Sequence, residues 1–411
     1  MPPYPLYLTI RGAAAFAGST AWTLVILYQI QSAGLNPFQL VLVGTVMEIT
    51  CFLAQVPTGI IADLYSRRLS IIVGYVLVGV GVMIQAIPEF AVILLGNVVW
   101  GIGITCIEGA EEAWATDEIG AERAGHVFTR GAQIGQLATV LGIGASVGLA
   151  SIQLNLPLIV GGAIPVLLGL VLIAVMPERH FHRAPAEDRT TFHAMRDQLV
   201  EGGRAVRMRP VLLSLIGAML FLGLSSEGID RLSQAHLLES FTFPSLGTPE
   251  IWFGAMGIVA MLGSVVLTEV VRRRVDVLQP RRVGQLLIVL QAGSCAAVLA
   301  FALAGQFWLA VACSLVAGLL GGVAGPLFTT WVVSQSESRT RATVFSLVGQ
   351  ANAAGQVLGG PPVGWIGTRF SIRWALGAAG LFVVPAIALY GIALRRQRRT
   401  VADEPPVPES V

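Results

Sequence analysis

Residues 131–177 read GAQIGQLATVLGIGASVGLASIQLNLPLIVGGAIPVLLGLVLIAVMP and contain no charged residue. A hydrocarbon core about 30 Å thick needs about 20 apolar residues per helical span, so this run is long enough to cross it twice. The turn residues Asn155-Leu156-Pro157 lie near its middle, where the chain can fold back. The stretch therefore predicts two membrane helices joined by a short turn.

Two further long charge-free runs, 12–47 and 283–336, contain turn residues at Leu35-Asn36-Pro37 and Gly305-Gln306. Applying the same length rule to the whole chain predicts an all-α membrane protein. We expect twelve helices, at 7–31, 38–62, 69–87, 91–114, 128–151, 156–176, 211–237, 251–271, 283–304, 307–332, 343–367 and 374–394.

The composition agrees with this interpretation. Of the 411 residues, 55% are hydrophobic and only 12% are charged, whereas roughly a quarter of an ordinary soluble chain is charged. The formal net charge of +2 gives no basic field that would favour nucleic acid as a partner. Motifs of ATPases, zinc proteases, serine hydrolases and thiol redox proteins are missing, so we expect no enzyme, cofactor or metal.

The positions of the arginines predict the orientation, because cytoplasmic loops retain positive charge. With the N-terminus inside, 23 of the 26 basic residues, all of them Arg, fall on the inner side. Only Arg231, Arg369 and Arg373 remain outside or in the outer half. We expect a multi-pass protein of the cell membrane with both termini in the cytoplasm and a first segment that is retained as a helix.

One long polar connector divides the chain into two groups of six spans. We expect an N-terminal bundle at 1–177, a cytoplasmic linker at 178–210, a C-terminal bundle at 211–396 and a cytoplasmic tail at 397–411. The linker is either solvated or carries a short surface helix, because Phe192, Met195 and Leu199 recur at helical spacing.

The two halves share residues in the same order. At an offset of 217, six residues of the first half fall on identical residues of the second: Gly101, Trp114, Val127, Phe128, Gln133 and Gly142 on Gly318, Trp331, Val344, Phe345, Gln350 and Gly359. At an offset of 205, Gly12, Phe16 and Gly18 fall on Gly217, Phe221 and Gly223. We therefore expect two pseudo-symmetric six-helix bundles that are copies of one unit.

The sharpest motif lies at the inner end of the second span and runs from Gly59 through Asp63 to Arg67 and Arg68. It resembles the G-x-x-x-D-x-x-x-R-[RK] signature of the major facilitator superfamily, found between the second and third helices. Asp63 and Arg67 stand four apart, the spacing at which opposite charges pair on a helix. The resemblance implies that these four residues form a gate, in which Asp63 meets the N-terminus of another helix and Gly59 allows close approach.

A weaker copy of the motif follows the eighth span, where Glu269 stands four residues before Arg273. Its glycine position is occupied by Val265, so close helix contact is not expected there. Together the two copies extend the resemblance over nearly the whole chain.

Three acids lie close together in the fourth span. Glu108, Glu111 and Glu112 have the i, i+3, i+4 spacing that places them on one face of a helix. Charge within a bilayer is costly, and clustered carboxylates repel, so we expect at least one of them to bind and release a proton. Alternatively, Glu111 and Glu112 are solvated and pair with Arg130 or Arg123.

The seventh and second spans carry the other ionisable candidates. Glu227, Asp230 and Arg231 lie in the seventh, where Glu227 and Arg231 either neutralise each other or take part in transport. Glu48 lies alone near the middle of the second span, and we expect a proton or cation site there rather than a structural hydrogen bond.

Departures from the family pattern limit what can be said of the substrate. Asn97 stands where many proton-coupled members have Arg, and a glycine pattern of drug antiporters is only partly matched by Gly135, Gly144 and Gly148. The pair Pro361-Pro362 is expected to bend or break the eleventh span.

Aromatic side chains also favour particular substrates. Trp22 and Trp100 are expected to line the cavity and suit a lipophilic or cationic substrate. Trp114 and Trp331 are expected to anchor helices at the inner interface.

The hypothesis is a secondary active transporter that exports small lipophilic or cationic molecules in exchange for protons, resembling the drug-efflux branch. Its expected partners are the substrate, protons and the bilayer, and we expect a monomer. Because Arg231 is the one cavity arginine expected, anionic substrates are disfavoured. The alternatives are uptake of a metabolite with protons, or a membrane sensor or scaffold that does not transport.

Overall fold

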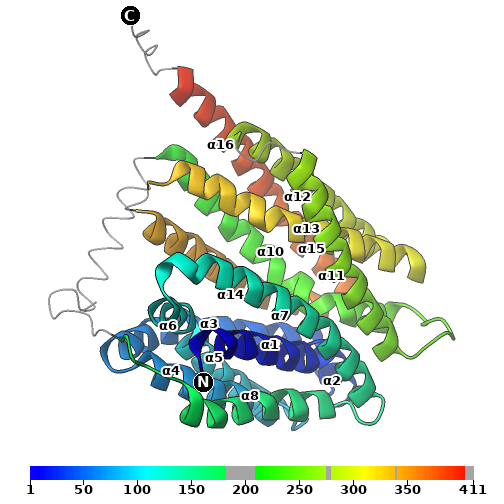
Figure 1. The fold of residues 1–411 in the computed structure, drawn as a ribbon. Helices are drawn as coiled ribbons and strands as arrows, with labels where there is room; N and C mark the ends of the chain where they lie inside the picture. The colour runs from blue at the N-terminus through cyan, green and yellow to red at the C-terminus, as the bar shows by residue number, and fades with distance from the viewer. Residues whose placement is uncertain (182–208, 275–278, 338–339, 403–411) are drawn as a thin grey trace, which may run out of the picture. The chain divides into compact units, whose positions relative to one another are not determined.

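A computed structural model describes residues 1–181, 209–274, 279–337 and 340–402 (Figure 1). Throughout these ranges the regular structure is α-helical. The first helices are α1 (Pro3–Trp22), α2 (Val25–Gln31), α3 (Pro37–Leu64), α4 (Arg67–Ile84), α5 (Phe90–Ile107), α6 (Ala110–Ile119), α7 (Ala121–Ala150) and α8 (Leu156–Val175). The later helices are α10 (Pro210–Ser240), α11 (Pro249–Arg274), α12 (Pro280–Leu303), α13 (Phe307–Gln335), α14 (Arg341–Arg369), α15 (Ile372–Leu381) and α16 (Val383–Ala402).

Eleven stretches of the described chain are helical, long and apolar enough to cross a membrane. They correspond to eleven of the twelve predicted spans. The remaining predicted span, 343–367, lies within α14, a helix of 29 residues that is less apolar because it carries Gln350, Asn352 and Gln356. The all-helical fold class is therefore confirmed.

The chain divides into two compact units. Unit 1 comprises Met1–Thr191 with Gln234–Ile258, and unit 2 comprises Phe192–Ser233 with Val259–Val411. The predicted surface helix near Phe192 and the end of the tail lie outside the described residues. The predicted limits of the linker and the tail therefore stay predictions.

In unit 1, α4 packs between α5 and α8, while α1 packs on α7 and α8 (Figure 1). Glycines permit these close contacts. A Cβ on Gly79 would meet the carbonyl oxygen of Gly162 at 2.3 Å, and one on Gly81 would meet that of Gly96 at 2.8 Å. Small residues thus let the helix backbones approach each other, as is common in membrane bundles.

In unit 2, α12 packs against α13, α15 and α16. The core contains Trp331, whose ring lies 5.9 Å from that of Tyr390, and both side chains are fully buried. The ring of Phe328 also packs against Tyr390, with the ring centroids 6.2 Å apart. Aromatic packing between α13 and α16 therefore forms the centre of this unit.

The predicted repeat is visible in the packing of each unit. In unit 1 a Cβ on Gly142 of α7 would meet the carbonyl oxygen of Phe16 on α1 at 2.6 Å and the hydroxyl of Ser19. In unit 2 a Cβ on Gly359 of α14 would meet the carbonyl oxygen of Leu224 on α10 at 2.3 Å. Leu224 is the residue on which Ser19 falls at the offset of 205, so equivalent glycines make equivalent contacts.

Three predicted helices differ from the sequence interpretation. The fourth span is broken between α5 and α6, because Gly109 adopts a φ of +77° that ends the helix. The first span is interrupted after Trp22, and the twelfth is interrupted at Phe382. Conversely, Pro361 and Pro362 do not break α14, which runs to Arg369. Prolines are tolerated within membrane helices where neighbours satisfy the freed backbone groups.

The proposed interfacial role of two tryptophans is wrong. Trp114 and Trp331 are 1% and 0% exposed and lie within the cores of unit 1 and unit 2. A side chain enclosed in this way cannot reach the lipid headgroups, so both residues contribute to internal packing instead.

Candidate functional site

The candidate site is a cavity of about 330 Å³ inside unit 1. One face of α1 forms a wall of it, with Arg11 at one end, Trp22 at the other and small residues between them. The rest of the lining comes from α4, α5, α6 and α8 together with Glu108. Because Ala14, Ala17, Gly18 and Ala21 carry little or no side chain, the wall between the charged end and the aromatic end stays open.

An ion pair occupies the charged end of the cavity. The side chain of Glu111 is 1% exposed, and its Oε1 lies 3.5 Å from Nη1 of Arg11. The Tyr75 hydroxyl donates a hydrogen bond of 2.7 Å to Oε2 of the same carboxylate. Arg11 is 43% exposed, so the pair has one enclosed partner and one that faces open space. Removing Arg11 would leave the enclosed carboxylate of Glu111 without a compensating positive charge, which is unfavourable.

The break at Gly109 determines how the three acids meet. Glu108 caps the end of α5 in an extended conformation, while Glu111 and Glu112 lie in the first turn of α6. The prediction that the three share one face of a continuous helix is therefore wrong. All three nevertheless line the same cavity, and the start of α6 favours nearby negative charge.

The alternative partners expected for these acids are also wrong for Glu111. Its partner is Arg11, whereas Arg130 donates from Nη1 to Gln133 at 2.9 Å. Because Arg11 lines the cavity, the expectation of no cavity arginine besides Arg231 is corrected as well.

Sequence reasoning misses Arg11 and Tyr75 as site residues. A span starting at residue 7 puts Arg11 at its inner end, but α1 begins at Pro3 and places it more than two turns inside the helix. Tyr75 carries no signal in the sequence that separates it from other apolar positions.

The aromatic end of the cavity is formed as expected. Trp22 and Trp100 both line it, and their rings meet edge to face with centroids 5.3 Å apart. Such an arrangement leaves ring faces available for an apolar or cationic group.

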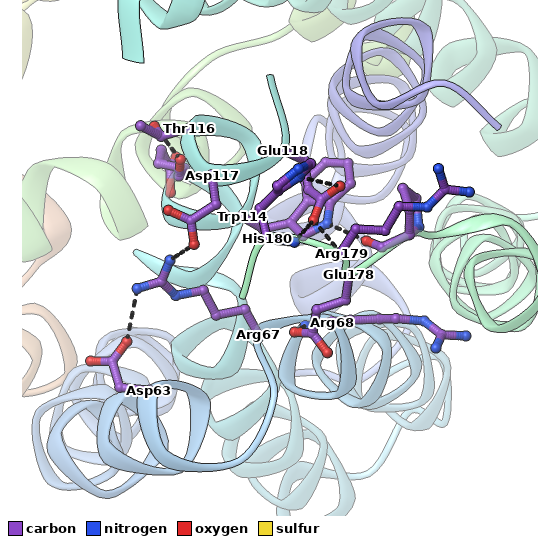
Figure 2. Close-up of polar contacts among 12 residues, drawn as sticks. Asp63, Arg67, Arg68, Trp114, Thr116, Asp117, Glu118, Glu178, Arg179 and His180 are labelled. Atoms are coloured by element: carbon purple, nitrogen blue, oxygen red, sulfur yellow. Dashed lines mark hydrogen bonds and ion pairs between the residues drawn. The ribbon is translucent and has the colours of Figure 1, made fainter. Parts of the chain in front are cut away.

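The motif between α3 and α4 forms a second polar cluster, shown in Figure 2. Arg67 lies between Asp63, at 3.5 Å, and Asp117 of α6, with which it also pairs. The predicted pairing of Asp63 with Arg67 is thus present, although α3 ends at Leu64 and Arg67 begins α4. The Ser66 side chain caps α4 by accepting from the amide of Leu69.

The same cluster binds the segment that follows α8. Glu178 accepts a hydrogen bond from the Ser66 hydroxyl at 2.6 Å and another from the Arg68 amide at 2.9 Å. The Arg68 guanidinium donates to the carbonyl oxygen of Ile173. Glu118 accepts from the amides of Arg179 and His180 (Figure 2). The motif therefore joins α3, α4, α6 and the end of α8 within unit 1.

Comparison with known proteins identifies the family and agrees with the all-helical fold. The family model of the Major Facilitator Superfamily matches residues 8–359 and 275–410. The chain belongs to this superfamily. It is thus a membrane transporter of the major facilitator type, a family that is not one of enzymes.

A curated relative is the uncharacterized MFS-type transporter YxaM of Bacillus subtilis (strain 168), 23% identical over 392 residues that cover 94% of each chain. Among solved structures, a variant of the nucleoside transporter NupG has a TM-score of 0.76 and 15% identity, covering 96% of this chain and 99% of that one. A bacterial homologue of the human lysosomal transporter Spinster has a TM-score of 0.74 and 16% identity, covering 99% and 100%. These structures show the major facilitator fold and leave the drug-efflux branch a proposal.

The gating role of the four motif residues, Gly59, Asp63, Arg67 and Arg68, stays a prediction. A Cβ placed on Gly59 would meet nothing within 4 Å among the described residues. In the second copy, Glu269 pairs with Arg272 at 2.7 Å and with Arg273 at 2.6 Å, and Val265 is exposed.

The remaining candidates of this transporter are spread over both units. In α10, Arg231 donates to Glu227 at 3.0 Å, which is the predicted neutralising pair, while Asp230 is exposed. Glu48 is half-buried in α3. Their roles in transport stay predictions. In the described part of the chain, no cluster of three His, Cys, Asp or Glu side chains could hold a metal ion.

Proposed function

We propose that this transporter couples the movement of a small lipophilic or cationic molecule to protons, by alternating access, and that Glu111 is the acid that exchanges the proton. The observation that carries the proposal is the buried Glu111 carboxylate held by Arg11 and Tyr75 on the wall of the cavity. A ligand shifts a conformational equilibrium only through unequal affinity for the two states. If one of the two states separates Arg11 from Glu111, a proton binds Glu111 more tightly in that state than in the other.

The enclosure of Glu111 supports coupling to protons. A carboxylate removed from water is stable as a charge only while a cation compensates it. When Arg11 moves away or binds another group, proton uptake removes the uncompensated charge. Glu108 lines the same cavity, and Glu48, Glu227 and Asp230 are further candidates for the same role.

The charge and surface of the cavity support a cationic or neutral amphipathic substrate. Three carboxylates face one guanidinium, so a cationic group is favoured at that end. The Trp22–Trp100 pair at the other end suits an apolar or aromatic body. We propose export as the direction, with proton-coupled uptake and a non-transporting sensor or scaffold as the alternatives.

The experiment is transport into and out of proteoliposomes with an imposed pH gradient, over a panel of amphipathic cations and neutral compounds. Because two structural neighbours are named as nucleoside and peptide transporters, nucleosides and dipeptides belong in the panel. We expect pH-driven flux of an amphipathic cation in the wild-type protein, and its direction separates export from uptake.

Glu111→Gln tests the assigned acid. We expect pH-driven flux to fall at least about tenfold, the loss that corresponds to about 1.4 kcal/mol in a transition state, while substrate binding persists. The control is Glu122→Gln, an exposed acid in the first turn of α7. Full pH-driven flux in Glu111→Gln would remove this residue from the mechanism, after which Glu108→Gln and Glu48→Gln are the next variants. Binding without counterflow in the wild type would favour the sensor.

A further inference from the structure

Unit 2 contains a second, larger cavity of about 820 Å³ between the end of α12 and the region where α14 gives way to α15. Its volume lies within the range of about 300–1,000 Å³ that is typical of sites for small ligands. α15 packs against both α12 and α14, and residues of all three helices line the cavity.

The wall of this cavity is apolar and open. Leu303 on α12 is 79% exposed, and Leu381 at the end of α15 is 56% exposed. Between them, a Cβ on Gly377 would meet nothing within 4 Å. From Arg373 to Leu381 the groove follows α15 for about 12 Å, at a rise of about 1.5 Å per residue. That is most of one leaflet, because the whole hydrocarbon core is about 30 Å thick.

One end of the cavity is positively charged. Arg373 is the one charged side chain in its described lining, and Arg369 lies four residues before it at the end of α14. Both are exposed, and neither has an ion-pair partner among the described residues. The sequence carries no acid within 299–306 or 365–382. A phosphate placed there meets uncompensated positive charge.

Aromatic side chains mark the same end as a membrane interface. Trp374 is 72% exposed and lines the cavity, and the exposed ring of Trp365 meets that of Phe370 at 5.8 Å. Tryptophan is enriched at the level of the headgroups, where arginine can also meet lipid phosphates. Arg369 and Arg373 are also two of the three arginines that the positive-inside rule leaves outside.

We propose that this groove binds one anionic phospholipid, with its phosphate at Arg373 and an acyl chain along α15 past Gly377 towards Leu381. The charged mouth selects the headgroup, and the open apolar wall receives the chain. A free phosphate ion would use only the mouth, and a neutral hydrocarbon would use only the wall. The site lies in unit 2 and does not depend on the proposed transport activity.

The test is native mass spectrometry of the full chain after incubation with phosphatidylglycerol or phosphatidylcholine of identical acyl chains. We expect the wild type to retain the anionic lipid over the neutral one by about fivefold, the size expected of a basic residue near an anionic lipid. Arg373→Gln should remove this preference, and Arg373→Lys should keep most of it. Gly377→Leu should lower the retention of both lipids.

Matched controls separate these effects from general damage. Arg281→Gln removes an exposed arginine at the start of α12, and Gly391→Leu adds a side chain at another open glycine. Neither should change retention. If Arg373→Gln fails to fold, the double variant Arg369→Gln/Arg373→Lys tests the same positively charged end of the cavity.

Several results would overturn the proposal. An unchanged preference for the anionic lipid in Arg373→Gln would show that the headgroup binds elsewhere. Unchanged lipid retention in Gly377→Leu would show that the acyl chain does not lie along α15. Saturation by inorganic phosphate without lipid retention would indicate an ion site. A dimer that Gly377→Leu dissociates would show that a second copy covers the groove.

Discussion

The two units share their packing but not their charge. The equivalent glycines Gly142 and Gly359 allow close helix packing, of α7 on α1 in one unit and of α14 on α10 in the other. The charged residues behave differently: at the offsets of the repeat, Arg11 and Glu111 fall on Ile216 and Phe328. Phe328 belongs to the core of unit 2, and Ile216 packs against that core.

This difference between the units separates the residues that hold the helices together from those that are candidates for function. A contact retained in both copies is required for helix packing, since the two copies have otherwise diverged. An enclosed ion pair carries a desolvation penalty. The other copy has apolar contacts at the equivalent positions and avoids this penalty. The Arg11–Glu111 pair is therefore the better candidate for function.

The largest effect is expected where the copies agree. Gly142→Leu and Gly359→Leu each place a side chain against backbone oxygens at 2.6 Å and 2.3 Å. Overpacking of this kind costs about 1–3 kcal/mol or more, so we expect both variants to lose most of their folded yield. The measurement is monodisperse protein after purification, together with the thermal unfolding temperature.

Two other glycines are matched controls for this experiment. A Cβ added to Gly144 on α7 or to Gly349 on α14 would meet nothing within 4 Å, so Leu at either position should be tolerated. If Gly142→Leu folds as well as Gly144→Leu, the close contact of α7 with α1 does not determine the bundle.

A smaller effect should separate the two equivalent tryptophans. Trp114 donates from Nε1 to the carbonyl oxygen of Pro177 at 2.7 Å, whereas Nε1 of Trp331 has no hydrogen-bond partner among the described residues. We expect Trp114→Phe to lower the free energy of unfolding by about 1 kcal/mol more than Trp331→Phe, the net value of one hydrogen bond. Denaturant unfolding followed by circular dichroism measures both. Equal losses would show that ring packing alone determines stability at these positions.

The sequence is sufficient for the helices, the repeat and the superfamily motif, because each depends on local composition or spacing. Charge-free runs define membrane spans by length alone, and Asp63 and Arg67 pair because they are near neighbours in the chain. The aromatic end of the cavity, with Trp22 and Trp100, also follows from residue type.

The sequence is insufficient where a single glycine or a distant contact decides the geometry. Gly109 looks like one of many small residues in a membrane helix, yet its positive φ ends α5 and redirects Glu111. The partners of Glu111 are 100 residues away, at Arg11, and 36 residues away, at Tyr75. No periodicity links such positions, so the ion pair emerges only from the packing of α1, α4 and α6.

The smallest effect concerns the two copies of the superfamily motif. In unit 1, Asp117 of α6 pairs with Arg67 and thereby joins two helices, whereas in unit 2 the pairs of Glu269 lie within α11. A contact between elements orders both of them, while an exposed pair along one helix contributes little. We expect Asp117→Asn to lower the free energy of unfolding by about 0.5 kcal/mol, within the range of about 0.2–1 kcal/mol for exposed pairs, and Glu269→Gln to cause no measurable change. Thermal unfolding of both variants beside Glu122→Gln measures this difference. Equal stability of Asp117→Asn and Glu269→Gln would mean that the charges of the first copy stabilise the protein no more than those of the second.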